Sequence, residues 1–174
     1  MLTARLAAQD DIPLLRALAR EIWGAYYPAI ISPGQIDYML ERMYASETIR
    51  AELAAGVVWE LLLLEGEAVG FLAHSLEGGG ATLALHKLYV RTTLHGQGIG
   101  RWALARVKAQ ALASRASRVT LRVNKGNARA IRAYERAGFR VAEALVSDIG
   151  GGYLMDDYVM ECALEPGGAS ECPE

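Results

Sequence analysis

Hydrophobic positions along the chain change their spacing several times, and each change predicts a new element. Between Ile12 and Ile22 apolar residues recur every three or four positions, as on the buried face of an amphipathic helix. From Val57 onward many apolar runs are short, and several alternate with polar residues, as in strands. The predicted helices are 10–27, 35–44, 47–54, 98–114 and 127–137, and the predicted strands are 2–6, 57–64, 68–75, 82–90, 118–123, 139–148 and 153–164.

This order of elements predicts an α/β fold, an α+β arrangement in which helices cover both faces of one mixed sheet. The two connections of the helix 98–114 indicate at least one parallel crossover within a mostly antiparallel sheet. A length of 174 residues suits one domain, and we assign it to residues 1–164. The remaining residues 165–174 are rich in Pro, Gly and Ser and are predicted to form a disordered tail.

Composition and charge narrow the classes of function. A net charge of −2 gives no basic face for nucleic acid, although backbone amides can still bind a phosphate. The two cysteines, Cys162 and Cys172, do not make a disulfide framework, and the three histidines are scattered, so we expect a reducing compartment and no metal site. Neither a signal peptide nor a membrane-spanning stretch is recognisable, so a cytoplasmic protein with no membrane partner is expected.

A glycine-spaced loop lies between the strand 82–90 and the helix 98–114. Gly96, Gly98 and Gly100 carry no side chain, so their N–H groups can converge on an anion at the positive end of the helix dipole. The spacing does not fit the dinucleotide fingerprint, because Arg101 stands where its third glycine would fall. A phosphate loop of the GxxxxGK[ST] kind is also excluded, because Arg101-Trp102 replaces the Lys-Ser/Thr pair.

The segment 95–100, His-Gly-Gln-Gly-Ile-Gly, resembles the Gln/Arg-x-x-Gly-x-Gly/Ala phosphate loop of the GNAT superfamily of N-acetyltransferases, with His95 at its first position. A second block, Asn127-x-x-Ala130-x-x-x-Tyr134-x-x-x-Gly138-Phe139, is similar to another motif of that family. The resemblance implies the GNAT fold, acetyl-CoA as cosubstrate and no metal. It assigns cofactor binding to Leu88, Val90, His95, Gly96, Gln97, Gly98, Ile99, Gly100, Arg101, Asn127 and Tyr134.

The resemblance also suggests catalytic roles. Tyr134 would protonate the departing sulfur, although a tyrosine on the buried face of a helix also serves simple packing. The backbone N–H of Val90 would stabilise the oxyanion. His86 is the candidate general base, because we expect it to share a strand face with Leu88 and Val90; an ordinary strand histidine, or a water chain doing the base's work, explains the position equally well.

The function expected is transfer of an acetyl group to a primary amine of a small molecule or a peptide. Segments 33–40 and 152–158 look like polyamine acetyltransferases of the PaiA type, which makes a polyamine one candidate acceptor. The alternative is a non-catalytic acyl-CoA-binding module that acts as a sensor or interaction domain. A homodimer is common among similar proteins and is an expectation by analogy only.

Overall fold

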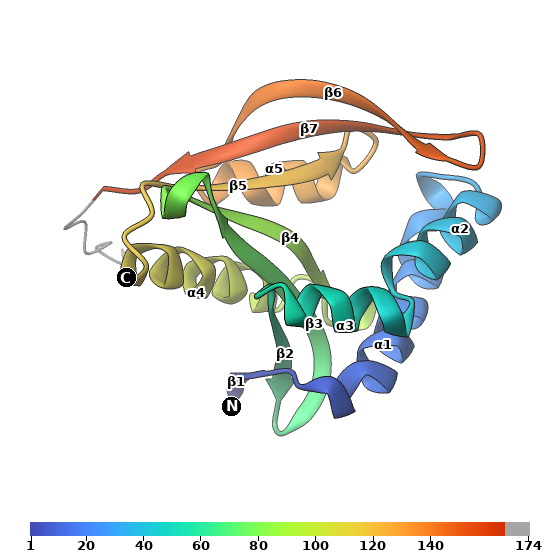
Figure 1. Cartoon of the computed structure of the whole chain (residues 1–174), viewed down its shortest axis with the longest axis horizontal. Helices are drawn as coiled ribbons and strands as arrows, with labels where there is room; N and C mark the ends of the chain where they lie inside the picture. The colour runs from blue at the N-terminus through green and yellow to red at the C-terminus, as the bar shows by residue number, and fades with distance from the viewer. Residues whose placement is uncertain (166–174) are drawn as a thin grey trace.

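The computed structural model describes residues 1–165, in which a single sheet carries helices on both faces (Figure 1). The predicted elements are confirmed to within a few residues at each end. The strands are β1 (Leu2–Leu6), β2 (Val58–Leu64), β3 (Glu67–Glu77), β4 (Thr82–Val90), β5 (Arg118–Asn124), β6 (Arg140–Gly150) and β7 (Tyr153–Ala163). The helices are α1 (Ile12–Tyr26), α2 (Pro33–Met43), α3 (Ser46–Ala54), α4 (Ile99–Ala113) and α5 (Ala128–Arg136), with short 3₁₀ turns η1 (Gln9–Asp11), η2 (Tyr27–Ala29), η3 (Gly78–Gly80) and η4 (Thr92–Leu94). The predicted tail lies, apart from Glu165, outside the described residues.

The seven strands form one mixed sheet in the order β1-β2-β3-β4-β5-β7-β6. Only β4 and β5 run parallel, and α4 makes the crossover between them, as the sequence predicts. Two-residue and glycine-rich turns connect the hairpins β2–β3, β3–β4 and β6–β7. Glu65 and Gly66, both with positive φ, turn β2 into β3. None of the helices within residues 1–165 is long and apolar enough to cross a membrane.

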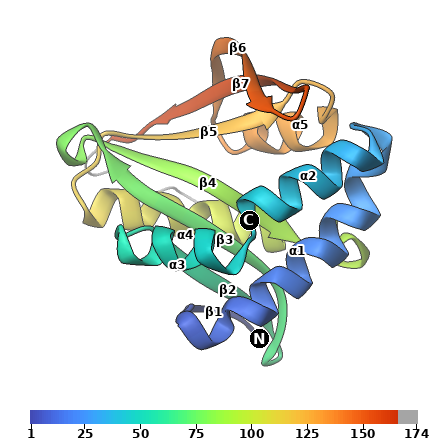
Figure 2. The same cartoon turned by 45° about the vertical axis from the view of Figure 1, so that its right-hand side comes forward.

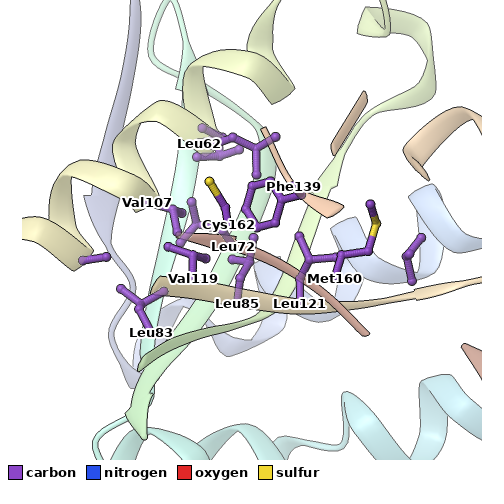
Figure 3. Packing of buried hydrophobic residues seen from close by; sticks show 14 of the residues in the cluster. Leu62, Leu72, Leu83, Leu85, Val107, Val119, Leu121, Phe139, Met160 and Cys162 are labelled. Carbon is purple, nitrogen blue, oxygen red and sulfur yellow. The ribbon is translucent and has the colours of Figure 1, made fainter. Parts of the chain in front are cut away.

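Each face of the sheet has its own hydrophobic core. α1, α2 and α3 cover one face (Figure 2), and this core holds aromatic residues such as Trp23, Trp59 and Phe71. α4 and α5 cover the other face, where Val107 and Phe139 pack against strand residues such as Leu72 (Figure 3). The first face is called the α1–α3 face below, and the second the α4–α5 face.

A buried ion pair fastens α4 to the sheet. The Glu60 side chain on β2 is only 1% exposed, and both of its oxygens accept hydrogen bonds of 2.8 Å from the Arg106 guanidinium. The Gln110 amide donates a third, also of 2.8 Å. Burial alone would raise the pKa of Glu60, but these donors outweigh it and lower the pKa below its usual value. The pair fixes the orientation of α4, whose first turn borders the site.

The parallel strands β4 and β5 pair over only four residues. Register partners run from Thr82 with Arg118 to Leu85 with Leu121, and beyond that point the described strands continue without pairing. We call the unpaired region between the ends of β4 and β5 the β4–β5 gap. It leaves backbone groups of both strands free at the centre of the sheet, where an extended ligand can take their hydrogen bonds.

A β-bulge in β4 changes the side-chain alternation. Leu85 pairs with His74 and Lys87 with Ala73, so His86 is an extra residue with no partner on β3. The His86 ring bonds Ser75 at 2.7 Å, while Leu88 packs in the core of the α4–α5 face. The prediction that His86 shares a face with Leu88 and Val90 is therefore wrong, because one inserted residue shifts the alternation.

A bridge of hydrogen bonds joins α2 to the tip of the β6–β7 hairpin, which reaches over to that helix (Figure 1). The Gln35 amide donates to the carbonyl of Leu154 at 2.8 Å. The hydroxyl of Tyr38 and the guanidinium of Arg42 both donate to the carbonyl of Ile149, at 2.7 and 2.9 Å. Helix and hairpin thus form a continuous wall on the α1–α3 face.

Candidate active site

A cavity of about 1480 Å³ lies at the β4–β5 gap and is open to both faces of the sheet. It borders residues of the glycine loop, both gap strands, α5 and the end of α1. Of the residues predicted for the site, it borders His86, Leu88, Val90, His95, Gly96, Gly98, Ile99, Gly100, Arg101, Asn127 and Tyr134. Gln97 does not border it; the Gln97 N–H instead bonds the carbonyl of Leu94 at 3.4 Å.

The glycine loop has the conformation that an anion cradle needs. Gly96 and Gly98 adopt φ values of 86° and 81°, which only glycine adopts without strain. Gly98 is the N-cap of α4, so the N–H groups of the first turn, at Ile99, Gly100 and Arg101, have no helical partner. A Cβ atom built at Gly96, Gly98 or Gly100 meets nothing within 4 Å, so the space above the loop is open. These features fit a pyrophosphate group.

Leu88 and Val90 turn their backbone groups toward the gap. The N–H of Arg91 bonds the carbonyl of Val69 on β3 at 2.9 Å. Because N–H directions alternate along a strand, the N–H and C=O of Val90, and those of Leu88 two residues earlier, point away from β3. The Val90 carbonyl accepts a bond of 3.0 Å from His95, if that ring nitrogen carries the proton. The Val90 N–H remains as a fixed donor directed into the gap.

Tyr134 approaches the gap from α5. Its ring packs against Phe139, with 5.9 Å between ring centroids, and it lies at the edge of the core of the α4–α5 face. Burial raises the pKa of the Tyr134 hydroxyl well above its usual value, and the neighbouring Tyr27 and Tyr26 raise it further. The phenol therefore stays protonated at neutral pH, as a proton donor must.

Asn127 connects three parts of the site. Its Oδ1 atom accepts a bond of 3.2 Å from the N–H of Ala130, which makes Asn127 the N-cap of α5. The same oxygen accepts a bond of 2.6 Å from the hydroxyl of Tyr26 at the end of α1. The Tyr26 ring also meets His95 edge-on at 5.6 Å. Asn127 thus holds α1 and α5 together at the gap.

The aromatic residues at the end of α1 serve both core and site. Trp23 is 1% exposed and stacks on Tyr27 with 4.5 Å between ring centroids, and both residues border the cavity. His74, by contrast, is buried beneath α4 near Glu60 and does not border the cavity.

His86 borders the cavity on the α1–α3 face and is more exposed than its neighbours on β4. Partial loss of hydration and the nearby Lys87 ammonium lower the pKa of His86, so the ring is neutral at pH 7. Its bond to Ser75 holds one ring nitrogen. Without the shared face with Val90, the geometric reason for making His86 the base is lost.

The cavity wall also contains an ion pair, Lys87 with Glu52, and a buried acid, Asp157. Lys87, 5% exposed, bonds Glu52 at 3.1 and 3.2 Å and lies 4.6 Å from the Trp59 ring centroid. Asp157 on β7 is 2% exposed, and its Oδ1 atom has no hydrogen-bond partner within the described residues. Alternation along β7 signals that Asp157 faces inward, but a pair of adjacent acids suggests a solvated surface.

Charge divides the cavity into two ends. Basic side chains border it beside the glycine loop and along α5, at Arg101, Arg129 and Arg136. On the α1–α3 face acidic side chains prevail among the described residues: Glu77, Glu143 and Asp157 face one unpaired cation, Arg122, while Glu52 and Lys87 neutralise each other. Within the described residues no cluster of His, Cys, Asp or Glu suited to a metal ion occurs. One end therefore suits an anion and the other a cation.

Comparisons with known proteins agree with this geometry. The structure is similar to PaiA N-acetyltransferase from Thermoplasma acidophilum in complex with coenzyme A, with a TM-score of 0.80 and 20% identity over 94% of this chain and 99% of that one. It is also similar to ribosomal-protein-S18-alanine N-acetyltransferase from Escherichia coli, with a TM-score of 0.72 and 18% identity over 98% of each chain. A third neighbour is YncA, a putative acetyltransferase from Salmonella typhimurium with its cofactor acetyl-CoA, with a TM-score of 0.65 and 20% identity over 100% of this chain and 98% of that one.

These likenesses are too distant in sequence to show more than the fold. A comparison with curated proteins finds no match in sequence. The acetyltransferase (GNAT) family, however, matches residues 16–139, which include the glycine loop, both gap strands and α5. With this match the fold and the enzyme class are established together: the chain belongs to the GNAT family of acetyltransferases.

Proposed function

We propose that this enzyme transfers the acetyl group of acetyl-CoA to a primary amine of a small, cationic molecule. Acetyl-CoA is the donor that suits the glycine loop and the β4–β5 gap. The N–H groups of Ile99, Gly100 and Arg101 would hold its pyrophosphate, and the free backbone of Leu88 and Val90 would pair with its amide-bearing arm. The observation that carries the acceptor class is the division of charge between the two ends of the cavity.

The acidic end supports a cationic acceptor. Glu77, Glu143 and Asp157 outnumber Arg122 there, so an ammonium group is attracted and an anionic acceptor is repelled. These acids lie on different strands, β3, β6 and β7, so they suit a molecule with more than one amino group. A polyamine is such a molecule, and the similarity of the fold to that of PaiA N-acetyltransferase also supports it. The bridge between α2 and the β6–β7 hairpin supports a small molecule, because it closes one side of the approach to bulky partners.

Two groups of the chain would assist the reaction on the donor side. The Val90 N–H would donate to the carbonyl oxygen of the acetyl group as negative charge develops there. Tyr134 would give its proton to the departing sulfur, because its raised pKa keeps the phenol protonated until a strong base forms beside it.

The experiment is an assay of free-thiol release from acetyl-CoA with spermidine, lysine, an aminoglycoside and a short peptide as acceptors. We expect release above background hydrolysis with the small cationic amines, spermidine foremost, and less with the peptide. Equal release of free thiol with every acceptor would contradict the proposal that the acidic end of the cavity selects a cationic acceptor. No release with any amine, in a protein that binds coenzyme A, would favour the alternative, a non-catalytic acyl-CoA-binding module.

A further inference from the structure

We infer that Asp157 receives the amino group of the acceptor and takes its proton as the nitrogen attacks. This inference rests on the proposed function and deepens it, because it assigns the proton acceptor of the same site. The supporting observation is that the Asp157 carboxylate is buried without forming an ion pair within the described residues.

The burial of Asp157 is nearly complete, at 2% exposure, and its Oδ1 atom lacks a hydrogen-bond partner within residues 1–165. The nearest cations do not form an ion pair with it: Lys125 is paired with Asp156, and Arg122 is exposed. An unpaired buried carboxylate costs several kcal/mol in general, because water no longer solvates it. A chain that keeps such a group at the wall of this cavity needs a cationic partner there, and an ammonium ion supplies one.

The position of Asp157 places it on the acceptor side of the gap. Its register partner on β5 is Asn124, which also borders the cavity, and its partner on β6 is Leu145. The neighbouring Tyr158 packs toward the α4–α5 face, so alternation directs Asp157 to the α1–α3 face, where the acidic end lies.

Tyr27 links Asp157 to the donor side. Burial raises the pKa of the Tyr27 hydroxyl, and the Asp157 carboxylate is near enough to raise it further. Tyr27 in turn raises the pKa of Tyr134. Tyr27, Tyr134 and Asp157 all border the same cavity, which places the proposed proton acceptor and proton donor at one site.

Charged neighbours leave the Asp157 carboxyl suited to proton transfer. Burial raises its pKa, and Asp156 adds to the rise, while Arg122 and Lys125 oppose it. Tyr27 of η2 is close enough to interact with it electrostatically, and Glu143 lies on the same face of β6 as Leu145, the register partner of Asp157. A raised pKa of the carboxyl group reduces the difference between its pKa and that of an alkylammonium ion, which is about 10.4 in water, and so makes the proton transfer less unfavourable.

The reaction balances with these two groups. The acceptor arrives as R–NH₃⁺ and gives one proton to Asp157. The lone pair of the acceptor nitrogen then forms the C–N bond to the acetyl carbon. The C–S bond breaks, and the sulfur keeps the electron pair and takes the proton of Tyr134. The second proton of the nitrogen restores Tyr134, and Asp157 releases its proton to water. The products are R–NH–CO–CH₃, coenzyme A as the thiol, and one proton.

The test compares wild type with Asp157→Asn and with the matched control Asp156→Asn, whose side chain is exposed on the other face of the same strand. Spermidine is the probe, with two measurements: the pH dependence of kcat/KM, and calorimetric binding of spermidine to the coenzyme A-loaded protein. We expect Asp157→Asn to lower kcat/KM by about 100-fold or more, to remove the acidic limb of the pH profile and to abolish binding. Asp156→Asn should keep kcat/KM at its optimum pH and the affinity for spermidine within about twofold of wild type, since its carboxylate does not face the cavity. Its acidic limb should remain and move to lower pH, because Asp156 raises the pKa of Asp157.

Asp157→Asn should also melt at or above the temperature of the wild type, because it removes an unpaired buried charge. If Asp157→Asn has the kcat/KM of the wild type and an unchanged pH profile, the role of Asp157 is overturned, whereas the proposed function is not affected. Loss of the acidic limb in His86→Ala, but not in Asp157→Asn, would overturn it in favour of His86.

Spermidine binding that depends on Asp157, without transfer, would uphold the amine site and refute the proposed reaction. Absence of both binding and transfer in wild type would overturn both proposals. Asp157→Ser is a second variant without the charge; if it and Asp157→Asn both fail to fold while Asp156→Asn folds, the carboxylate is structural and the inference is wrong.

Discussion

The hydroxyl of Tyr26 donates a hydrogen bond of 2.6 Å to the Oδ1 atom of Asn127, across 101 positions of sequence. That oxygen also caps α5 through the N–H of Ala130. The bond therefore couples the end of α1, which borders the acceptor side, to the helix that carries Tyr134. It makes the placement of the proposed acid depend on a residue outside both sequence motifs.

Tyr26→Phe tests this coupling. Loss of the bond should lower the free energy of unfolding by about 1 kcal/mol. Asn127→Ala, which removes the cap as well, should cost about 1 kcal/mol more than that. Because both changes break the same bond, the double variant should cost less than their sum in urea unfolding. Strict additivity would show that the bond contributes nothing to stability.

Tyr134→Phe tests the proposed acid. It should lower kcat by about 100-fold or more, because it removes the hydroxyl that would protonate the departing sulfur. Calorimetry should find the affinity for coenzyme A within about twofold of wild type, since the ring is retained. Tyr158→Phe is the control, a half-buried tyrosine on the same face that does not border the cavity. If Tyr134→Phe is as active as Tyr158→Phe, Tyr134 is not the acid and serves only in packing.

Two alanine substitutions separate loop conformation from ligand access. Gly98→Ala should lower the free energy of unfolding by about 1–2 kcal/mol, because Gly98 holds φ at 81°. Gly100→Ala should leave stability unchanged or slightly raised, since its Cβ meets nothing within 4 Å and alanine favours a helix.

Gly100→Ala should nevertheless weaken coenzyme A binding by about tenfold or more, because the methyl group enters the space above the cradle and disturbs a hydrogen bond to a charged phosphate. Thermal unfolding and calorimetry, run on the same two preparations, check both expectations. Unaltered affinity in Gly100→Ala would place the pyrophosphate elsewhere.

Arg106→Met should destabilise the protein by about 3 kcal/mol, because it leaves the Glu60 carboxylate buried with only the Gln110 amide as a partner. The pKa of Glu60 is lower in the folded protein than its ordinary value, so the stabilisation is present above the unfolded pKa of about 4.3 and is lost as the pH falls through the folded pKa. The cost of Arg106→Met should therefore be largest at pH 7 and smaller near pH 4. Urea unfolding at both values, with the exposed Arg101→Met as control, measures it.

The sequence predicts the elements of this fold well and the site only in part. Helices and strands follow from hydrophobic spacing, and the cradle follows from three glycines before a helix. The bulge at His86 is not predictable, because alternation assumes an uninterrupted strand and one extra residue reverses the faces. The burial of Asp157 is not predictable either, because two adjacent acids on a strand suggest a solvated surface, and the pairing of β7 with β5 and β6 is fixed between separate segments of the chain.

The shortness of the β4–β5 pairing has a mechanical consequence. Within residues 1–165, four register pairs and the adjoining bond from the Ser117 N–H to the Ala81 carbonyl join the β1–β4 half of the sheet to the β5–β7–β6 half. A ligand arm bound along Leu88 and Val90 would add backbone hydrogen bonds at the β4–β5 gap and so strengthen the connection between the two halves. The amide of Val90 should then exchange its hydrogen quickly in the free enzyme and slowly with coenzyme A bound, as the two halves stop opening about their hinge at Leu85 and Leu121.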